Sequence, residues 1–398
     1  MTRRPPTDLV RTDEAIRRYG EAGRRWLDAM ADADPLADAV VADRYASGSA
    51  TGAVATALTD GIDALPDAPE SLRALFALLD DEPSWVDHDA MARAADALVQ
   101  HTAAFGFVLG AASLLRGAVN TVAGMPLVQS GRYVSQPAVR SVEVGEWLRR
   151  VATPGGMRRD GEGFAYTVRV RIIHAHVRRG LRLAGRWDEQ RWGAPIPQPY
   201  MAFTMAEFGH IALDAMGRVG VRFTDAELAD IYHLWRYVGH VVGVDDHLNP
   251  RSAEDYVRIE GLYRLTSPGP SADDIAFVDA LTDDYLVPEL AGALPGPDRL
   301  TRPLATTLTR GMQRVFLGDE QADQLRIPRT RLEPLMRAAE PLMAASGRVR
   351  VLALGGRKRL IRRGYRLRDV EMDRMRADYG VEHQMVDDAP DARHREPA

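Results

Sequence analysis

Apolar residues recur along this chain at intervals of three and four positions, and strand-like alternation of apolar and polar residues is scarce. Such spacing places apolar side chains on one face of a helix. The pattern therefore predicts an all-α protein. The helices that it indicates cover residues 12–45 (one or two helices), 85–122, 137–152, 163–183, 199–219, 224–244, 272–293, 300–316 and 328–345.

Residues typical of helix ends support several of these boundaries. Ser135 is a candidate N-cap with Pro137 in the first turn of the following helix, and Thr224 with Glu227 forms a T-x-x-E capping box. Gly220 follows the preceding helix, where a glycine commonly ends a helix. We therefore expect one helix to begin near 137 and another near 225. The helix predicted at 199–219 should end before Gly220.

Turn-forming residues divide the chain unevenly. Pro, Gly and Ser punctuate positions 47–70, which predicts N-terminal helices and a loop over 1–70 and one large helical domain over 71–386. The polar, Pro-containing residues 387–398 predict a disordered tail.

Composition narrows the possible functions. The chain has 398 residues, 45% hydrophobic content and a net charge of -5, which suggests neither nucleic acid nor an acidic substrate as partner. It has no cysteine, so thiolate metal sites and covalent haem attachment are excluded. The basic segment 348–368 is interpreted as a solvated terminal helix with acidic partners on the body, with a membrane or nucleic-acid patch as the alternative.

The N-terminus lacks the apolar run of a signal peptide, because prolines and aspartates follow Arg3 and Arg4. The most apolar stretch, 105–118, contains Arg116 and is shorter than the roughly 20 residues of a membrane span. We therefore expect a cytoplasmic protein without stable membrane insertion.

The predicted helix 163–183 places one histidine on its apolar face. His174 shares that face with Val170 and Val177, while Arg171 lies one turn before the histidine and Arg178 one turn after it. A haem b site needs such parts, namely an imidazole for iron and cations for two propionates. A core histidine flanked by solvated arginines has the same spacing, so spacing alone leaves both interpretations open.

The segment 171–178, RIIHAHVR, together with Gly131-Arg132 before it and WRYVG at 235–239 after it, resembles the latex-clearing protein and mpaB-like oxygenase family. The resemblance covers roughly residues 100–250 and extends more faintly beyond. It implies a globin-like helical core with His174 as the proximal ligand of haem b. Arg178 and, by a looser alignment, Thr204 match positions that the family uses near the propionates.

On the distal side, the rubber-cleaving members carry an R-x-x-K-T pattern, whereas this chain has Arg140 followed by Glu143 and Val144. The departure puts lysine ligation and rubber as substrate in doubt. Glu143 is a candidate general base if an apolar cavity encloses it and raises its pKa. The alternative is an ion pair with Arg140, three residues earlier on the same helix.

Two further helices carry motifs that allow a different metal site, a di-iron centre, as the alternative to haem. Residues 207–210 form an E-x-x-H motif and residues 230–233 a D-x-x-H motif, which are faintly similar to the paired motifs of di-iron bundles. Such bundles also need a glutamate from each of two other helices, and the candidates Glu143 and Glu146 share one helix. A local surface pair is the simpler interpretation of Glu207 and His210.

The sequence thus predicts a haem b-dependent oxygenase that uses O₂ to oxidise or cleave an apolar, unsaturated small molecule, isoprenoid or polyketide-like. His174 would hold the iron, Arg171, Arg178 and Thr204 the haem, and Glu143 with Arg140 would act in catalysis. The alternatives are a non-catalytic haem-binding or sensor protein and a di-iron oxygenase.

Overall fold

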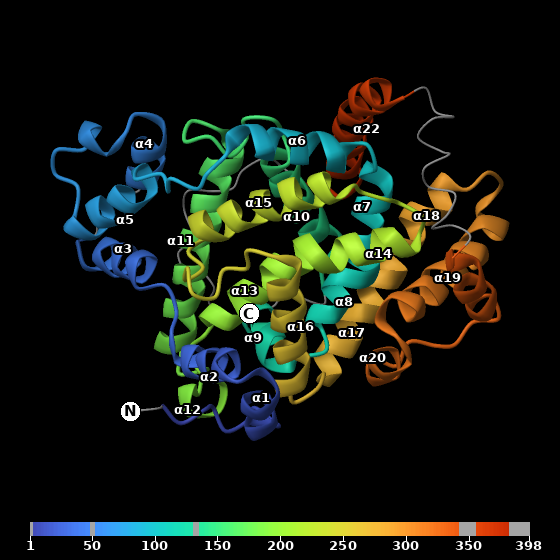
Figure 1. The fold of residues 1–398 in the computed structure, drawn as a ribbon, viewed down its shortest axis with the longest axis horizontal. Coiled ribbons are helices and arrows are strands. Elements are labelled where there is room, and N and C mark those ends of the chain that lie inside the picture. Colours follow the sequence, from blue (N-terminus) through green and yellow to red (C-terminus); the bar gives the residue numbers. More distant parts are fainter. Residues whose placement is uncertain (1–2, 48–51, 130–134, 342–355, 382–398) are drawn as a thin grey trace, which may run out of the picture.

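The computed structural model describes residues 3–47, 52–129, 135–341 and 356–381, and every regular element in these ranges is a helix (Figure 1). The all-α prediction is confirmed. The first part of the chain contains α1 (Thr12–Tyr19), α2 (Glu21–Asp28), α3 (Pro35–Ser47), α4 (Ala53–Thr59), α5 (Glu70–Asp80), α6 (His88–Val99), α7 (Thr102–Val108), α8 (Leu114–Gly117) and α9 (Thr121–Gln129).

The second part carries the longest helices. It contains α10 (Pro137–Val151), α11 (Glu162–Leu183), α12 (Glu189–Trp192), α13 (Gln198–Ala206), α14 (Ala212–Arg218), α15 (Asp225–Val242), α16 (Ala253–Thr266), α17 (Ala272–Leu281), α18 (Val287–Ala293), α19 (Asp298–Leu317), α20 (Asp319–Gln324) and α22 (Arg357–Asp378). Residues 333–341 are also helical. The helix expected at 328–345 therefore begins later than predicted, because residues 328–332 form a loop and turn, and residues 342–345 lie outside the described residues.

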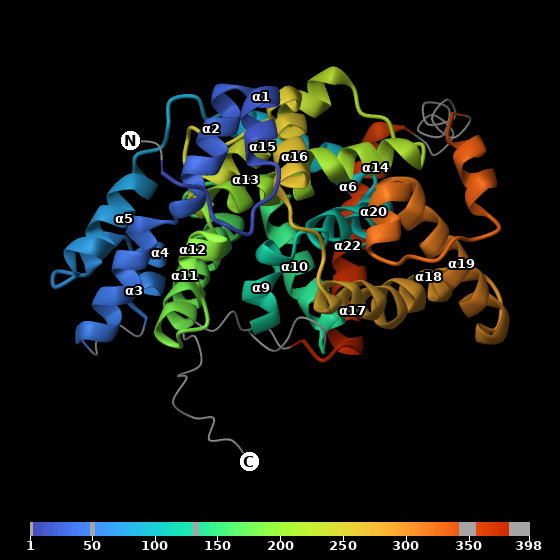
Figure 2. The ribbon, with the colours of Figure 1, turned by 90° about the horizontal axis from the view of Figure 1, so that it is seen from below.

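The helix α11 joins the N-terminal helices to the rest of the molecule. It packs against α3 on one side and against α10 and α15 on the others, and both views show it beside α3 (Figures 1 and 2). One continuous core of buried apolar side chains extends from Leu9 to Ile327. The described residues therefore form a single large helical domain, and the tail predicted at 387–398 lies outside them.

Helix ends follow the sequence signals at some positions only. The Thr224–Glu227 capping box is present, and Gly220 has the positive φ of 87° that its place after a helix predicts. The expected Ser135 cap is wrong, because Gln136 holds the N-cap position without a side-chain hydrogen bond. The helices α4 and α16 were not predicted, although Ser252 and Asp255 form a second capping box before α16.

Three predicted helices contain a π-helical turn that periodicity could not indicate. These turns are η3 (Leu109–Ser113), η4 (Glu207–Ile211) and η5 (Thr282–Leu286), and η3 packs against both others. A π-turn adds a residue to one helical turn and is frequent at functional sites. The turns therefore redirect the side chains that follow them.

The C-terminal basic segment is a helix with acidic partners on the body, as expected for the part that is described. In α22, Arg357 lies 2.9 Å from Glu227, and Arg374 forms an ion pair with Glu289. The Arg368 guanidinium donates to the carbonyl oxygen of Ala152 over 2.8 Å. These contacts fix α22 beside α6 and α10.

In the part of the chain that the structure describes, no single helix has both the length and the apolar composition of a membrane span. His88–Val99 and Thr102–Gly117 meet that test only as a pair, and the pair is bent by 87°. Several of the side chains in this pair belong to the buried core.

Candidate haem site

The helix α11 presents Arg171, His174 and Arg178 toward the interior, and a buried ion pair fixes the first of them. The Nε of Arg171 donates to Asp34 over 2.6 Å and one Nη donates to the other carboxylate oxygen over 3.0 Å. The remaining Nη donates to the carbonyl oxygen of Val241 over 3.3 Å. Both side chains of the pair are buried, at 4% and 2% exposure. The Arg171 guanidinium is therefore committed to the protein.

Gly243 allows this ion pair to lie close to the backbone. It ends α15 with a φ of 91°, and a Cβ there would lie 2.6 Å from both Arg171 Nε and an Asp34 carboxylate oxygen. Any side chain at this position would displace the pair, so glycine is required for both its conformation and its size.

Arg178 is fully buried and only partly satisfied. Its Nε donates to the carboxylate of Asp38, on α3, over 2.6 Å, whereas neither Nη atom has a hydrogen-bond partner among the described residues. Buried polar groups are nearly always hydrogen-bonded, because an unpaired charged donor is costly. The two unpaired NH₂ groups therefore indicate a site for an anionic acceptor.

His174 lies between the two arginines and forms no hydrogen bond with the described residues; its Nδ1 is buried without a partner. Burial and the charge of Arg178 lower the pKa of His174 to about 4, with a further contribution from Arg140 and an opposing one from Asp34. The imidazole is therefore neutral at pH 7, which is the form that binds a metal.

The other predicted residues lie outside this group. The Thr204 hydroxyl donates to the carbonyl oxygen of Tyr200 over 3.0 Å, within its own helix. His176 lies on the opposite face of α11 from His174, where its Nε2 is 3.4 Å from an Nη of Arg44.

Arg140 and Glu143 form an ion pair, which was the alternative to a general base in an enclosed cavity. The distance between Nη1 and Oε2 is 3.0 Å. Their side chains are 44% and 36% exposed, so the expected enclosure of Glu143 in an apolar cavity is wrong. The buried carboxylate of α10 is Glu146 instead. Burial alone would raise its pKa, but hydrogen bonds from Arg149 and the charge of Arg150 hold that pKa below its usual value.

The residues of the two motifs proposed for a di-iron centre contact separate partners. Asp230 accepts two hydrogen bonds from Arg93, both of 2.9 Å, and the Nε2 of His233 accepts from the backbone N–H of Asp87. A His210 ring nitrogen lies 3.0 Å from the Tyr232 hydroxyl. Across the described ranges, no three His, Cys, Asp or Glu residues are grouped as metal ligands would be. The structure does not support a di-iron centre there.

Glu207, in η4, is a carboxyl group whose burial the sequence pattern did not predict. It forms no hydrogen bond with the described residues, and burial raises its pKa to about 8. A Cβ on Gly117 would lie 2.4 Å from its Oε1, so the carboxyl packs directly against α8. Its E-x-x-H spacing suggested a surface pair with His210, but Glu207 is half-buried with its carboxyl against α8, and its raised pKa keeps that carboxyl protonated at neutral pH.

Comparisons with known proteins agree with this fold. The profile of the family described as "ER-bound oxygenase mpaB/B'/Rubber oxygenase, catalytic domain" matches residues 98–349. A rubber oxygenase of Streptomyces sp. (strain K30) is 27% identical over 335 residues, which cover 79% of this chain and 74% of that protein. A solved structure of latex clearing protein LCP in the closed state superimposes with a TM-score of 0.63 at 22% identity, covering 83% of this chain and 89% of the other.

These matches define the class of the protein as an all-α oxygenase, and the chain is accordingly an oxidoreductase. More specifically, it belongs to the mpaB/rubber oxygenase family. The resemblance seen in the RIIHAHVR segment is thus confirmed at the level of the family. An enzyme is favoured over a protein that only binds a cofactor.

The Asp34–Arg171 pair generates a stability prediction. Asp34→Asn leaves a buried guanidinium without its counter-charge, so we expect the free energy of unfolding to fall by about 3–5 kcal/mol. Asp230→Asn is the matched control, because its partner Arg93 is 55% exposed and the loss should be much smaller. Urea unfolding followed by circular dichroism measures both. Equal losses would contradict the structural role assigned to the buried pair.

Glu207 generates a pH prediction. Its pKa is about 8 in the folded protein against an ordinary value of 4.5, so between these values the unfolded chain releases a proton that the folded protein retains. Stability should therefore fall as pH rises from 4.5 to 8. Relative to wild type, Glu207→Gln should gain about 2–4 kcal/mol of unfolding free energy between pH 5 and pH 9.

The control for this experiment is Glu254→Gln, at an exposed position on α16. Comparing each variant with wild type at both pH values cancels any constant effect of the amide. If the difference in unfolding free energy between Glu207→Gln and wild type did not change with pH, the Glu207 carboxyl would be solvated.

Proposed function

We propose that this chain is a haem b-dependent oxygenase that uses O₂ to oxidise or cleave an apolar, unsaturated small molecule of isoprenoid or polyketide type. The observation that carries the proposal is the pairing of a neutral, unpartnered His174 with an Arg178 whose two terminal NH₂ groups have no acceptor among the described residues. One group would bind iron and the other a propionate, so both requirements of the haem meet on one helix.

Arg178 fits a role in haem binding better than Arg171 and Thr204 do. Arg178 can donate to a propionate without losing its bond to Asp38, whereas Arg171 would first have to leave Asp34. Thr204 would have to withdraw its hydroxyl proton from the carbonyl oxygen of Tyr200. We therefore assign propionate binding first to Arg178, and the roles of Arg171 and Thr204 stay predictions.

A bound haem b would supply the iron at which O₂ is activated. The chain's own part begins with His174, which stays unprotonated at neutral pH and so keeps a ring nitrogen that would hold the iron. Arg178 supplies a fixed positive charge beside it. The imidazole is half-buried on the face of α11 that also carries Val170 and Val177, and such apolar surroundings favour an apolar substrate.

Catalytic roles for Arg140 and Glu143 stay predictions as well. In their ion pair Glu143 accepts a hydrogen bond from the Arg140 guanidinium, and a carboxylate is a group that can accept a proton. The site could serve as a base only where substrate covers the pair, because both side chains are partly exposed without it.

The first test of the proposal is retention of haem. Purified wild-type protein should show a Soret band, and His174→Ala should lose it while keeping its helical circular dichroism spectrum. His176→Ala is the control, because that imidazole lies on the opposite face and the band should persist. Full haem with an unchanged spectrum in His174→Ala would overturn the assignment.

A second test concerns the base. With an isoprenoid or polyketide olefin identified by O₂-uptake screening, Glu143→Gln should keep haem and substrate binding but lose most turnover, because an amide cannot take the proton. Glu146→Gln is not a suitable control, since that carboxylate is buried and forms ion pairs with two partly buried arginines. Turnover equal to wild type would leave Glu143 as half of a structural ion pair.

A further inference from the structure

The outer side of α22 carries a patch of cations that the ion pairs described above do not use. The exposed side chains that form this cationic face are Lys358, Arg359, Arg362, Arg363 and Arg366. Their spacing of three and four positions places them on one side of the helix. Arg357 and Arg368 nearby are paired with Glu227 and Asp369, whereas no acidic side chain of the described residues forms an ion pair with the cationic face.

The opposite side of α22 is fixed to the body of the protein. Leu360 is buried at 9% exposure, and the Tyr365 hydroxyl donates to the carboxylate of Asp96 over 3.0 Å. Gly364 lies directly against the end of α6, because a Cβ there would be 2.1 Å from the carbonyl oxygen of Val99. Figure 1 shows α22 at the edge of the molecule, beside α6. The cationic face is therefore held pointing away from the protein.

The position of these cations is unfavourable for the helix itself. They lie in its first half, near the positive end of the helix dipole, and the first turn contains no acidic residue. Arg359 is also three and four positions from Arg362 and Arg363, where like charges repel one another. Such departures from local helix preferences are expected where a surface serves a function.

The charge of the remaining chain gives the cationic face a direction. The chain has a net charge of -5, so everything outside these five side chains carries -10. An extended anionic surface would repel most of the molecule and attract this face. The protein can therefore approach such a surface in one preferred orientation.

Two exposed apolar side chains lie next to the cations. Leu367 and Val370 are 50% and 61% exposed. They follow Arg363 and Arg366 by four positions, so they lie on the same side of the helix. Basic and apolar side chains together on an exposed helix face are typical of helices that lie in the interface of an anionic membrane. The phosphate backbone of a nucleic acid has no matching contact for the apolar pair.

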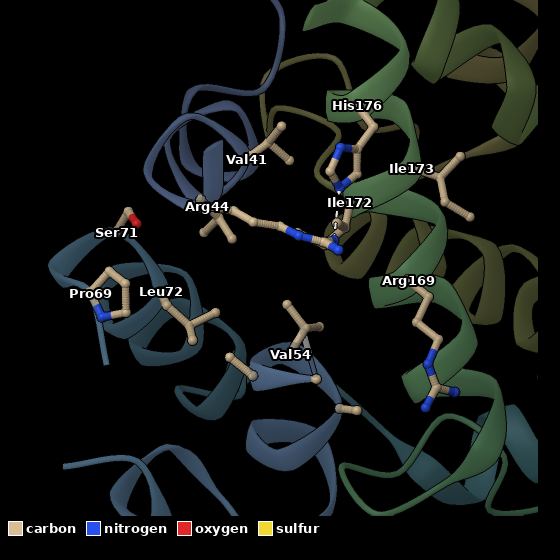
Figure 3. Close-up of a pocket in the computed structure, with 14 residues that line it drawn as sticks. Val41, Arg44, Val54, Pro69, Ser71, Leu72, Arg169, Ile172, Ile173 and His176 are labelled. Atoms are coloured by element: carbon tan, nitrogen blue, oxygen red, sulfur yellow. Dashed lines mark hydrogen bonds between the residues drawn. The ribbon is translucent and has the colours of Figure 1, made fainter. Parts of the chain in front are cut away.

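The arginines at the pocket beside α11 do not provide a comparable anion site. Figure 3 shows Arg44 directed at His176, whose Nε2 lies 3.4 Å away. Only about 50 Å³ of that pocket is open to a ligand, which is room for a few water molecules.

We propose that the cationic face of α22 docks the protein onto an anionic phospholipid surface. The arginines contact head-group phosphates, which guanidinium groups match in shape and charge, and Leu367 and Val370 enter the interface. The protein binds this surface without crossing it. An apolar substrate of the kind proposed above would dissolve there, but the docking does not depend on that proposal or on haem.

Vesicle flotation of the full chain tests the proposal. One set of vesicles is phosphatidylcholine alone, and the other is an equal mixture of phosphatidylcholine and phosphatidylglycerol. The protein should bind the mixed vesicles only, and added sodium chloride should weaken binding because it screens the charges. Equal binding to both sets, or no binding to the mixed vesicles, would overturn the proposal.

A charge-matched pair of variants places the contact on α22. Arg362→Gln combined with Arg363→Gln should weaken binding to the mixed vesicles about thirtyfold, given the usual contribution of a basic side chain at an anionic surface. Arg299→Gln combined with Arg302→Gln removes the same charge from exposed positions on α19 and should bind as wild type does. Equal losses in the two double variants would contradict the assigned face.

A fluorescent label reports contact with lipid directly. The chain has no cysteine, so Val370→Cys can carry a single polarity-sensitive fluorophore. Its emission should shift to shorter wavelength with the mixed vesicles. Val257→Cys, at a position on α16 that is 54% exposed, is the control and should show no shift. No shift at position 370, or an equal shift at both positions, would contradict the docking geometry.

Duplex DNA and duplex RNA of mixed sequence test the other extended anion with the wild-type protein. At equal phosphate concentration, both duplexes should bind more weakly than the mixed vesicles. Tighter binding of either duplex would overturn the proposal and assign the cationic face to a nucleic acid.

Discussion

The buried ion pair between Arg171 and Asp34 determines how the candidate haem site is assembled. It joins the middle of α11 to the residue just before α3, and Gly243 leaves room for it at the end of α15. A buried charge pair adds little net stability, yet loss of one partner is severe. The pair therefore acts mainly as a constraint that fixes how α3, α11 and α15 meet. That constraint also fixes the direction of His174, one turn further along α11.

Arg178 differs from Arg171 in a way that suggests function. Arg171 uses all three of its guanidinium nitrogens within the protein, whereas Arg178 uses only Nε and leaves both Nη atoms unpaired in the interior. His174, also without a hydrogen bond, lies between them along the helix. A protein core normally satisfies such groups. We interpret the unsatisfied pair as the protein's half of contacts that a bound cofactor completes.

Sequence periodicity predicted the extent of α11 almost to the residue, and the capping box at Thr224 fixed the start of α15. The partners of Arg171 and Arg178 could not be predicted, because Asp34 and Asp38 lie 137 and 140 positions earlier in the chain. No local pattern encodes contacts between such distant segments.

Burial of single side chains was equally hard to predict. Glu143 was expected inside and is partly exposed, because its partner Arg140 lies on the outer side of α10. Glu207 was expected at the surface and is half-buried, with its carboxyl directed from the π-turn η4 toward Gly117. Helical spacing gives the face of a residue only while the helix stays regular.

The most direct test of the account is resonance Raman spectroscopy of the ferrous protein under nitrogen, after purification with its haem. An axial neutral imidazole produces an iron–histidine stretching band in a five-coordinate ferrous haem. We predict this band in the wild-type protein, with His174 as its source. A haem-loaded protein without the band, or a purified protein that binds no haem, would contradict the central claim.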